Sequence, residues 1–159
     1  MKREVHELEP IWFPDSRVLI LGSFPSVVSR KHNMYYANPA NRFWRVMENI
    51  FEDSSEDKVS FLKRHHIALW DVIASCMIEK SYDASIRDIT YNDIEGLMPK
   101  TEIRMIFTTG GKAADLYQRH FGDAFPHIAL PSTSGANARM SFDVLCDHYK
   151  VIREYTDET

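Results

Sequence analysis

Four short apolar runs, each nearly continuous rather than alternating, constrain the fold of this chain more than any other feature. They cover residues 17–22, 66–70, 104–109 and 127–131. Continuous apolar character is typical of parallel strands that are covered on both faces, because a strand with one face in water alternates apolar and polar residues. We therefore expect these four runs to be buried, parallel strands.

Helical patterns fall between the expected strands. The predicted helices cover residues 41–51, 55–65, 91–98, 111–121 and 141–155. Ser55 is placed to cap the second helix, Pro99 to end the third and Gly122 to end the fourth. Alternating strands and helices favour right-handed crossovers, so the predicted fold is α/β, a three-layer α/β/α sandwich with a central, mainly parallel four-stranded sheet. The length of 159 residues fits a single domain, 1–159.

Composition restricts the class of protein. With 44% hydrophobic and 26% charged residues, the chain should fold as a globule, and no run approaches the roughly 20 apolar residues of a membrane span. Its first residues lack the apolar core of a signal peptide, so we expect a cytoplasmic protein with no membrane partner. Cys76 and Cys146 have neither CxxC spacing nor a set of His ligands nearby, which predicts buried apolar side chains and no metal. Cys76 as a nucleophile is the competing interpretation.

The net charge of −4 argues against a protein that coats nucleic acid, but the distribution of charge is uneven. Residues 16–47 and 124–142 contain no acidic side chain. The basic residues in these two stretches are Arg17, Arg30, Lys31, Arg42, Arg45 and Arg139. A polyanion would be tolerated beside them, although chance clustering accounts for the charges equally well.

The loop after the first strand carries a set of residues suited to binding a base. Small residues in 22–26 allow a tight turn at the sheet edge, where α/β folds bind their ligands. Tyr36 then supplies an aromatic face that can stack on a base, and the amides of Asn38 and Asn41 can read its edges. Locally, Asn41 is also a good helix N-cap. The aromatic pair 43–44 is predicted to belong to the core.

The loop 130–139, after the fourth strand, is small and polar. It is either an ordinary connection or a backbone surface that approaches phosphates closely. The turn 110–112 precedes a helix and would hold an anion there, although it lacks P-loop spacing. Asp71 and the segment 81–86 would reach the same rim, and Asp71 is equally suited to cap a helix. The pair 65–66 should end a helix and begin a strand rather than bind a metal.

Together, the two loops resemble the motif pair of the uracil-DNA glycosylase superfamily. The nearest match is to its mismatch-specific branch and, closer still, to the hypoxanthine-DNA (deoxyinosine) glycosylases. In the mismatch-specific branch the first strand ends in Gly-Ile-Asn-Pro-Gly, and an aromatic residue precedes Pro-x-Asn-x-Phe-Trp. Here residues 22–26 read Gly-Ser-Phe-Pro-Ser, and Tyr36 precedes Pro-Ala-Asn-Arg-Phe-Trp at 39–44. The Leu-Pro-x-x-Ser-Gly loop of that branch matches 130–135.

The sequence departs from the superfamily pattern at one position, and this departure determines which residue the resemblance implies to be catalytic. The water-activating Asn or Asp of the superfamily falls on Phe24, which cannot orient water. The hypoxanthine branch is similar in lacking that polar residue, and it implicates the Asn before x-Phe-Trp, which is Asn41 here. The resemblance further implies that Tyr36 stacks on the flipped base and that Ala136 or Asn137 fills the vacated stack. The expected substrate-binding residues are Gly22, Ser23, Phe24, Tyr36 and Asp83, and the expected DNA-binding residues are Ser132, Ser134, Gly135, Ala136 and Asn137.

The resemblance implies a monofunctional DNA glycosylase of base excision repair, a hydrolase that cleaves the N-glycosidic bond of a deaminated base in damaged DNA. Hypoxanthine is favoured as the base, with uracil and xanthine as alternatives. No cofactor is expected, because donors such as the Ser23 and Phe24 amides and the Asn41 side chain would stabilise the departing base. A monomer is expected. Two other functions stay open: a non-catalytic binder of damaged DNA, and an α/β hydrolase that acts on free nucleotides through 110–112.

Overall fold

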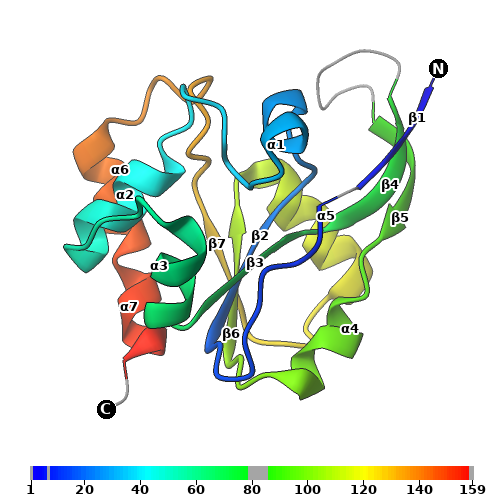
Figure 1. Cartoon of the computed structure of the whole chain (residues 1–159). Helices are drawn as coiled ribbons and strands as arrows, with labels where there is room; N and C mark the ends of the chain where they lie inside the picture. The colour runs from blue at the N-terminus through cyan, green and yellow to red at the C-terminus, as the bar shows by residue number, and fades with distance from the viewer. Residues whose placement is uncertain (1, 7, 79–85, 158–159) are drawn as a thin grey trace.

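A four-stranded parallel sheet forms the centre of the computed structural model, which describes residues 2–6, 8–78 and 86–157 (Figure 1). Its strand order is β3-β2-β6-β7, and each neighbouring pair runs parallel. The strands are β2 (Val18–Gly22), β3 (Ile67–Asp71), β6 (Met105–Thr109) and β7 (His127–Leu130). These are the four strands predicted from the apolar runs.

Helices cover both faces of this sheet, and alternate residues of β2 face opposite layers. Val18 and Ile20 belong to the core on one face, whereas Leu19 and Leu21 belong to the core on the other. One layer contains α2 (Phe43–Phe51), α3 (Lys58–Arg64), α6 (Phe142–Tyr149) and α7 (Val151–Thr156) (Figure 1). The other contains α4 (Ile94–Leu97) and α5 (Gly111–Phe121) (Figure 1). The predicted three-layer sandwich is therefore confirmed.

A second sheet, which the sequence patterns did not predict, lies beside the first (Figure 1). It is antiparallel, with strand order β1-β4-β5, and consists of β1 (Lys2–Val5), β4 (Ile73–Ile78) and β5 (Ile86–Tyr91). Because only Val72 separates β3 from β4, the chain leaves the central sheet and enters the second one almost directly. This sheet joins the N-terminal segment to the end of β3.

Four predicted helices differ from those in the structure. The predicted helix 41–51 begins at Phe43 as α2, and its N-cap is Arg42 rather than the predicted Asn41. The N-cap of α3 is Asp57, because the backbone N–H and the hydroxyl of Ser55 are both bound to the Glu48 carboxylate instead. The predicted helix 91–98 is wrong at its start, since Tyr91 ends β5 and Asp93 caps α4. At its end, Pro99 lies inside a 3₁₀ turn, η2 (Met98–Lys100), where a proline early in the turn costs no hydrogen bond.

The last predicted helix, 141–155, is two helices, α6 and α7, which meet at Lys150. A further helix that was not predicted, α1 (Val27–His32), occupies the loop after β2 and begins at the N-cap Ser26. Other features agree with the prediction. The stripe on α2 is buried, Gly122 ends α5 with a positive φ of 55°, and both cysteines are buried. Among the described residues, no helix has the length and apolar character to cross a membrane.

Candidate active site

A cavity of about 450 Å³ lies at the carboxyl ends of the parallel strands. The last residue of β3 and the chain at the ends of β2, β6 and β7 contribute to its wall, as expected for a ligand site in an open α/β sheet. The lining residues are Gly22, Ser23, Phe24, Pro25, Ser26, Ser29, Tyr35, Tyr36, Asn38, Ala40, Asn41, Asp71, Thr109, Gly110, Gly111, Lys112, Ser132, Thr133, Ser134, Gly135 and Ala136. The structure thus brings both predicted loops to one cavity.

Tyr36 is held rigidly in the cavity wall. Its backbone is in the left-handed region, with φ 57°, and its ring stacks on Phe43 with centroids 3.9 Å apart and an interplanar angle of 15°. Its hydroxyl lies 3.0 Å from Thr109 Oγ1. Burial, and then the nearby Asp71, raise the pKa of Tyr36 well above its ordinary value, so the phenol stays protonated. Stacking on a flipped base stays a prediction, and the geometry fits it because the ring is already fixed.

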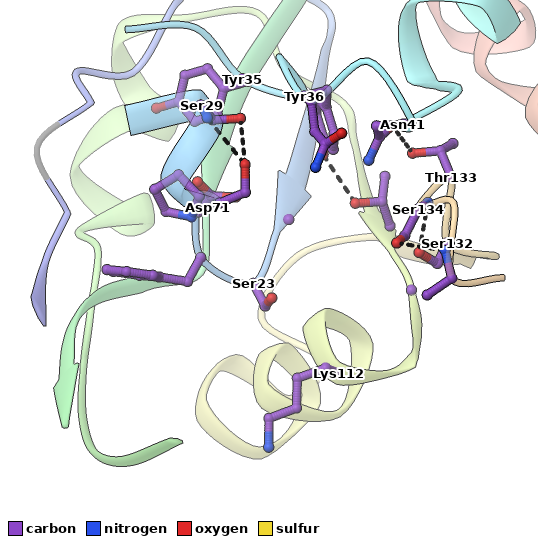
Figure 2. Close-up of a pocket in the computed structure, with 18 of the residues that line it drawn as sticks. Ser23, Ser29, Tyr35, Tyr36, Asn41, Asp71, Lys112, Ser132, Thr133 and Ser134 are labelled. Carbon is purple, nitrogen blue, oxygen red and sulfur yellow. Dashed lines mark hydrogen bonds between the residues drawn. The ribbon is translucent and has the colours of Figure 1, made fainter. Parts of the chain in front are cut away.

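Asn41 has a fixed orientation in the cavity wall. Its Oδ1 accepts hydrogen bonds from the Phe43 backbone N–H at 2.9 Å and from Thr133 Oγ1 at 2.8 Å. Because a backbone N–H can only donate, the atom that faces Phe43 must be the amide oxygen. The Asn41 Nδ2 atom has no hydrogen-bond partner within the described part of the chain, and Figure 2 shows it directed away from Thr133. Asn41 therefore stabilises the start of α2 and also leaves a donor at the cavity.

The loop after β7 is joined to the segment before α2 by close backbone contacts. The Arg42 N–H donates to the Thr133 carbonyl at 2.9 Å. Gly135 packs so tightly that a Cβ atom there would lie 3.0 Å from the Ala40 carbonyl oxygen. A glycine at 135 thus lets the two loops approach without the crowding that a side chain would cause. The contacts that order the second loop also position Thr133 beside Asn41.

Asn137, one of the two residues expected to fill a vacated base stack, does not line the cavity. Its Nδ2 donates to the Ser132 carbonyl at 2.9 Å, and its own carbonyl accepts from Arg42 at 3.0 Å. The Asn137 side chain therefore holds the loop in shape rather than projecting from it. Ala136 is exposed. Together with Ser132, Ser134 and Gly135, it lines the cavity. Their contacts with DNA stay predictions.

Phe24 forms part of the wall, as expected from the sequence. The Arg30 guanidinium carbon lies 5.4 Å from the centroid of its ring, and the His6 ring meets it edge-on at 5.9 Å. Arg30 is also paired with Glu4 at 2.9 Å. These neighbours fix the ring and close this end of the cavity. A phenyl ring offers no hydrogen bond to water, so any polar chemistry must come from other residues of the wall.

Asp71 is a further residue of the cavity wall, and neither it nor its hydrogen-bond partner His6 belongs to a recognisable motif. Asp71 ends β3, and its Oδ2 lies 2.8 Å from His6 Nε2, with side-chain exposures of 5% for Asp71 and 2% for His6. Burial raises the pKa of Asp71, and the hydrogen bond with His6 opposes that rise. Asp71 was considered as a rim residue or a helix cap, and it is a wall residue followed by a strand. Asp83, expected to bind substrate, lies outside the described residues.

The turn before α5 also reaches the cavity, but its lysine does not point toward the centre. Gly110 has φ 94°, which allows the sharp entry into α5, and Gly111 and Lys112 follow it along the wall. Figure 2 shows the Lys112 ammonium group directed away from the other labelled residues. Within the described residues, no three His, Cys, Asp or Glu side chains are grouped so as to hold a metal ion.

The family model of the uracil DNA glycosylase superfamily matches residues 11–155. This range covers both loops of the cavity and nearly the whole chain. The chain belongs to the uracil DNA glycosylase superfamily. A hypoxanthine DNA glycosylase of Methanosarcina acetivorans is 39% identical over 135 residues, which are 80% of this chain and 84% of the relative. A hypoxanthine DNA glycosylase of Methanosarcina barkeri is 31% identical over 136 residues, 82% of this chain and 86% of that protein.

A solved structure within the superfamily agrees with the fold. The solution NMR structure of a candidate uracil DNA glycosylase from Methanosarcina acetivorans superimposes with a TM-score of 0.81 at 33% sequence identity. The match covers 94% of this chain and 97% of that one. The chain is thus a DNA glycosylase of this superfamily by fold and by sequence, and the recognition made from the two loops is confirmed.

Proposed function

We propose that this glycosylase removes hypoxanthine from DNA that contains deoxyinosine, as the first step of base excision repair. Both curated relatives described above carry the name hypoxanthine DNA glycosylase, and their similarity extends over more than three quarters of the chain. The cavity of about 450 Å³ is at the lower end of the range for small-molecule sites, which suits a single flipped base and its sugar. Uracil and xanthine remain alternative bases.

The observation that carries the proposed chemistry is the fixed amide of Asn41. Its oxygen is held by two donors, so its Nδ2 presents a pre-oriented N–H group to the cavity. In hydrolysis, the bond between the sugar C1′ and the base nitrogen breaks and its electron pair leaves with the base. Water then adds to C1′ and the base takes up a proton. A donor aimed at the departing base stabilises its developing negative charge without needing to reorganise.

The other groups of the wall have supporting roles in this proposal. The Ser23 and Phe24 main chains lie at the turn after β2 and are further candidate donors. Tyr36 is a rigid platform for the flipped base, because its own ring is stacked on Phe43 and its hydroxyl is bound to Thr109. Extrusion of a base costs a few kcal/mol, and less when the base is mispaired, which favours damaged sites.

Damaged DNA is the proposed partner, and the exposed basic residues near the loops fit this role. Lys31, Arg45 and Arg139 are exposed, whereas Arg42 is bound to the carbonyls of Asn137 and Met140 and serves the fold. Of the basic residues in the two acid-free stretches, Arg42 therefore stabilises the fold, whereas the exposed side chains are available to contact phosphate groups. We also propose a monomer, and a cytoplasmic location is retained as a prediction.

The test is cleavage of duplexes that each carry one uracil, hypoxanthine, xanthine or thymine–guanine mismatch, followed by alkali to reveal abasic sites. We expect the fastest strand cleavage with hypoxanthine. Binding without cleavage of any duplex would instead indicate a non-catalytic binder. Turnover of free nucleotides with no action on DNA would indicate a hydrolase that uses the 110–112 turn, and the direction of Lys112 argues against it.

A further inference from the structure

Asp71 belongs to the cavity wall and is paired with the buried His6, but the pair has no part in the mechanism above. The two side chains are joined by a 2.8 Å contact between His6 Nε2 and Asp71 Oδ2. Both are almost completely buried, with side-chain exposures of 2% and 5%. Removing two such groups from water costs free energy, which their mutual interaction must offset. A pair of this kind on the wall of an active site needs a functional account.

Strand pairing positions His6 beside Asp71. β1 pairs with β4, and the His6 N–H donates to the Ala74 carbonyl at 2.7 Å, which sets the histidine beside the end of β3. The match to the superfamily model begins at residue 11, so His6 lies before the matched region. The N-terminal segment thus places beside Asp71 a side chain from outside the region that the superfamily model matches.

The pair leaves one oxygen of Asp71 as a hydrogen-bond acceptor whichever group holds the proton. If the ring nitrogen holds it, both carboxylate oxygens are acceptors and Oδ2 accepts from His6. If the carboxyl group holds it, the proton lies on Oδ2 and points at His6 Nε2, and Oδ1 is the carbonyl-like acceptor. His6 therefore ensures that a proton on the Asp71 carboxyl group lies on Oδ2 and never on Oδ1. Oδ1 is an acceptor in both states.

Oδ1 lies among the polar groups of the cavity floor. A Cβ atom on Gly22 would lie 2.5 Å from Asp71 Oδ1, 3.3 Å from the Tyr36 hydroxyl and 3.7 Å from Thr109 Oγ1. Three polar atoms thus converge on Gly22, next to the aromatic platform, and the Gly22 backbone also hydrogen-bonds to the Asp71 carboxylate. Because a carboxylate oxygen accepts more than one hydrogen bond, acceptor capacity remains for a base. An acceptor at this point faces the edge of a base that stacks on Tyr36, where the hydrogen-bonding groups of a base are found.

Deaminated bases share one feature on that edge. Hypoxanthine, xanthine and uracil each carry a ring N–H next to a carbonyl group, whereas adenine has a ring nitrogen with a lone pair at the corresponding position. A fixed acceptor forms a hydrogen bond with the first kind of edge and opposes a lone pair on the second. Sites built to satisfy a substrate hydrogen bond discriminate strongly, because a mismatched ligand leaves a buried group unpaired.

We propose that His6 is a positioning residue that holds Asp71 so that Oδ1 accepts the ring N–H of the deaminated base and excludes adenine. The proposal rests on the function proposed above and adds to it the group that tells deoxyinosine from deoxyadenosine. Hypoxanthine arises from adenine, and the two purines have similar shape. A fixed acceptor of this kind would reject the abundant parent base by its hydrogen-bonding edge rather than by its shape.

The first test measures binding, so that it does not depend on cleavage. Duplexes carry a single 2′-fluoroarabino analogue of deoxyinosine or of deoxyadenosine, which resists hydrolysis, opposite an abasic analogue. For the wild type and for Asp71→Ala we measure one ratio, the dissociation constant for the deoxyadenosine duplex divided by that for the deoxyinosine duplex. We expect this ratio to fall by about tenfold or more in Asp71→Ala, because a hydrogen bond to a charged or buried acceptor is lost. Because every protein is measured with the same two duplexes, differences in the fraction of folded protein and in the cost of base flipping cancel when the ratios of different proteins are compared.

The second test separates positioning by His6 from a merely structural role. His6→Leu removes the polar partner of Asp71, and His6→Gln returns an amide that can reach the position of Nε2. We expect His6→Leu to lower the adenine-to-inosine ratio of dissociation constants and His6→Gln to restore it to within about threefold of the wild type. His148→Leu, on the exposed face of α6, is the matched control and should leave the ratio unchanged.

The outcomes distinguish this inference from the proposed function. A ratio that is unchanged in Asp71→Ala overturns the inference, even if the wild type cleaves deoxyinosine DNA. Equal ratios of the two dissociation constants in His6→Leu and His6→Gln would show that His6 does not position Asp71. If the wild type cleaves no deoxyinosine duplex but Asp71→Ala still loses selective binding, the proposed function fails and the selectivity of the pocket stands.

Discussion

The Thr133 hydroxyl donates to Asn41 Oδ1 at 2.8 Å, across a separation of 92 positions in the chain. This bond joins the loop after β7 to the start of α2 and fixes which end of the Asn41 amide faces the cavity. The second loop, whose backbone was expected to contact DNA, thus also controls the residue to which we assign the chemistry. Predictions about either loop therefore involve the other.

Thr133→Val should slow base removal by about fivefold to tenfold, because it deletes the hydroxyl that holds the Asn41 amide and preserves the shape of the side chain. Thr133→Ser keeps the hydroxyl and should react at nearly the wild-type rate. Single-turnover cleavage of a deoxyinosine duplex at saturating enzyme measures the effect. Equal rates for the two variants would show that the orientation of Asn41 does not depend on Thr133.

Gly22→Ala should lower both activity and stability. Its new Cβ would lie 2.5 Å from Asp71 Oδ1, so the carboxyl group or the strand must move, at a cost of about 1–3 kcal/mol. Gly111→Ala is the matched control for stability, since a Cβ there meets nothing within 4 Å. Urea unfolding of both variants checks this prediction. A Gly22→Ala variant as stable as the wild type would mean that Asp71 is not held against the backbone.

Arg139→Ala should weaken binding to DNA of any sequence and reduce the slope of log K against log salt by about one unit, as expected for one lost phosphate contact. Arg139 is exposed and follows the second loop. Arg119→Ala is the control, because Arg119 is exposed near the far end of α5 from the cavity and pairs with Asp115. Fluorescence anisotropy over a range of salt concentrations gives both slopes. The same slope of log K against log salt in both variants would show that Arg139 does not contact a DNA phosphate.

Stability should fall as the pH falls through the ordinary pKa of histidine, in part because of His127. Burial lowers the pKa of His127 below its usual 6.5, and its Nε2 lies 2.8 Å from Thr108 Oγ1. Below pH 6.5 the unfolded chain binds a proton that the folded chain does not, so stability present at higher pH is lost. The loss accumulates until the pH reaches the lowered pKa of the folded protein, below which both states are protonated.

The measurement is the free energy of urea unfolding at about pH 8 and about pH 5.5 for the wild type and His127→Gln. We expect the wild type to lose more stability than the variant between these two conditions. Parallel losses in the two proteins would mean that the His127 ring is accessible to a proton in the folded state.

Much of the fold was predictable because local patterns decide it. The apolar run from Val18 to Leu21 is completely buried, as a parallel strand between two helical layers must be. The stripe on α2 likewise indicated its buried face, and Phe43 and Trp44 lie in the core as expected. The site followed from the fold, since loops after parallel strands meet at one edge, and Tyr36, Asn41 and Ser134 do meet there.

What the sequence patterns missed depends on contacts between distant residues. His6 reaches Asp71 through strand pairing across 65 positions, and neither residue belongs to a recognisable motif. The antiparallel sheet was missed because β1 (KREV) and β5 (IRDITY) mix charged and apolar residues, so their stability comes from pairing rather than from an apolar run. The structural role of Asn137 was missed for a similar reason. Its amide satisfies the Ser132 carbonyl of its own loop, which the composition of the loop does not reveal.

The central claim is that Asn41 acts on the reacting base and does not merely cap α2. Asn41→Ala is compared with Asn49→Ala, an exposed asparagine on the same helix, for single-turnover cleavage and for binding of a deoxyinosine duplex. We predict that Asn41→Ala slows cleavage by about 10²–10³-fold, as expected for loss of one pre-oriented donor, while its DNA affinity and that of Asn49→Ala stay close to the wild type. Equal losses of cleavage and binding in Asn41→Ala would reduce Asn41 to a structural residue and contradict the account.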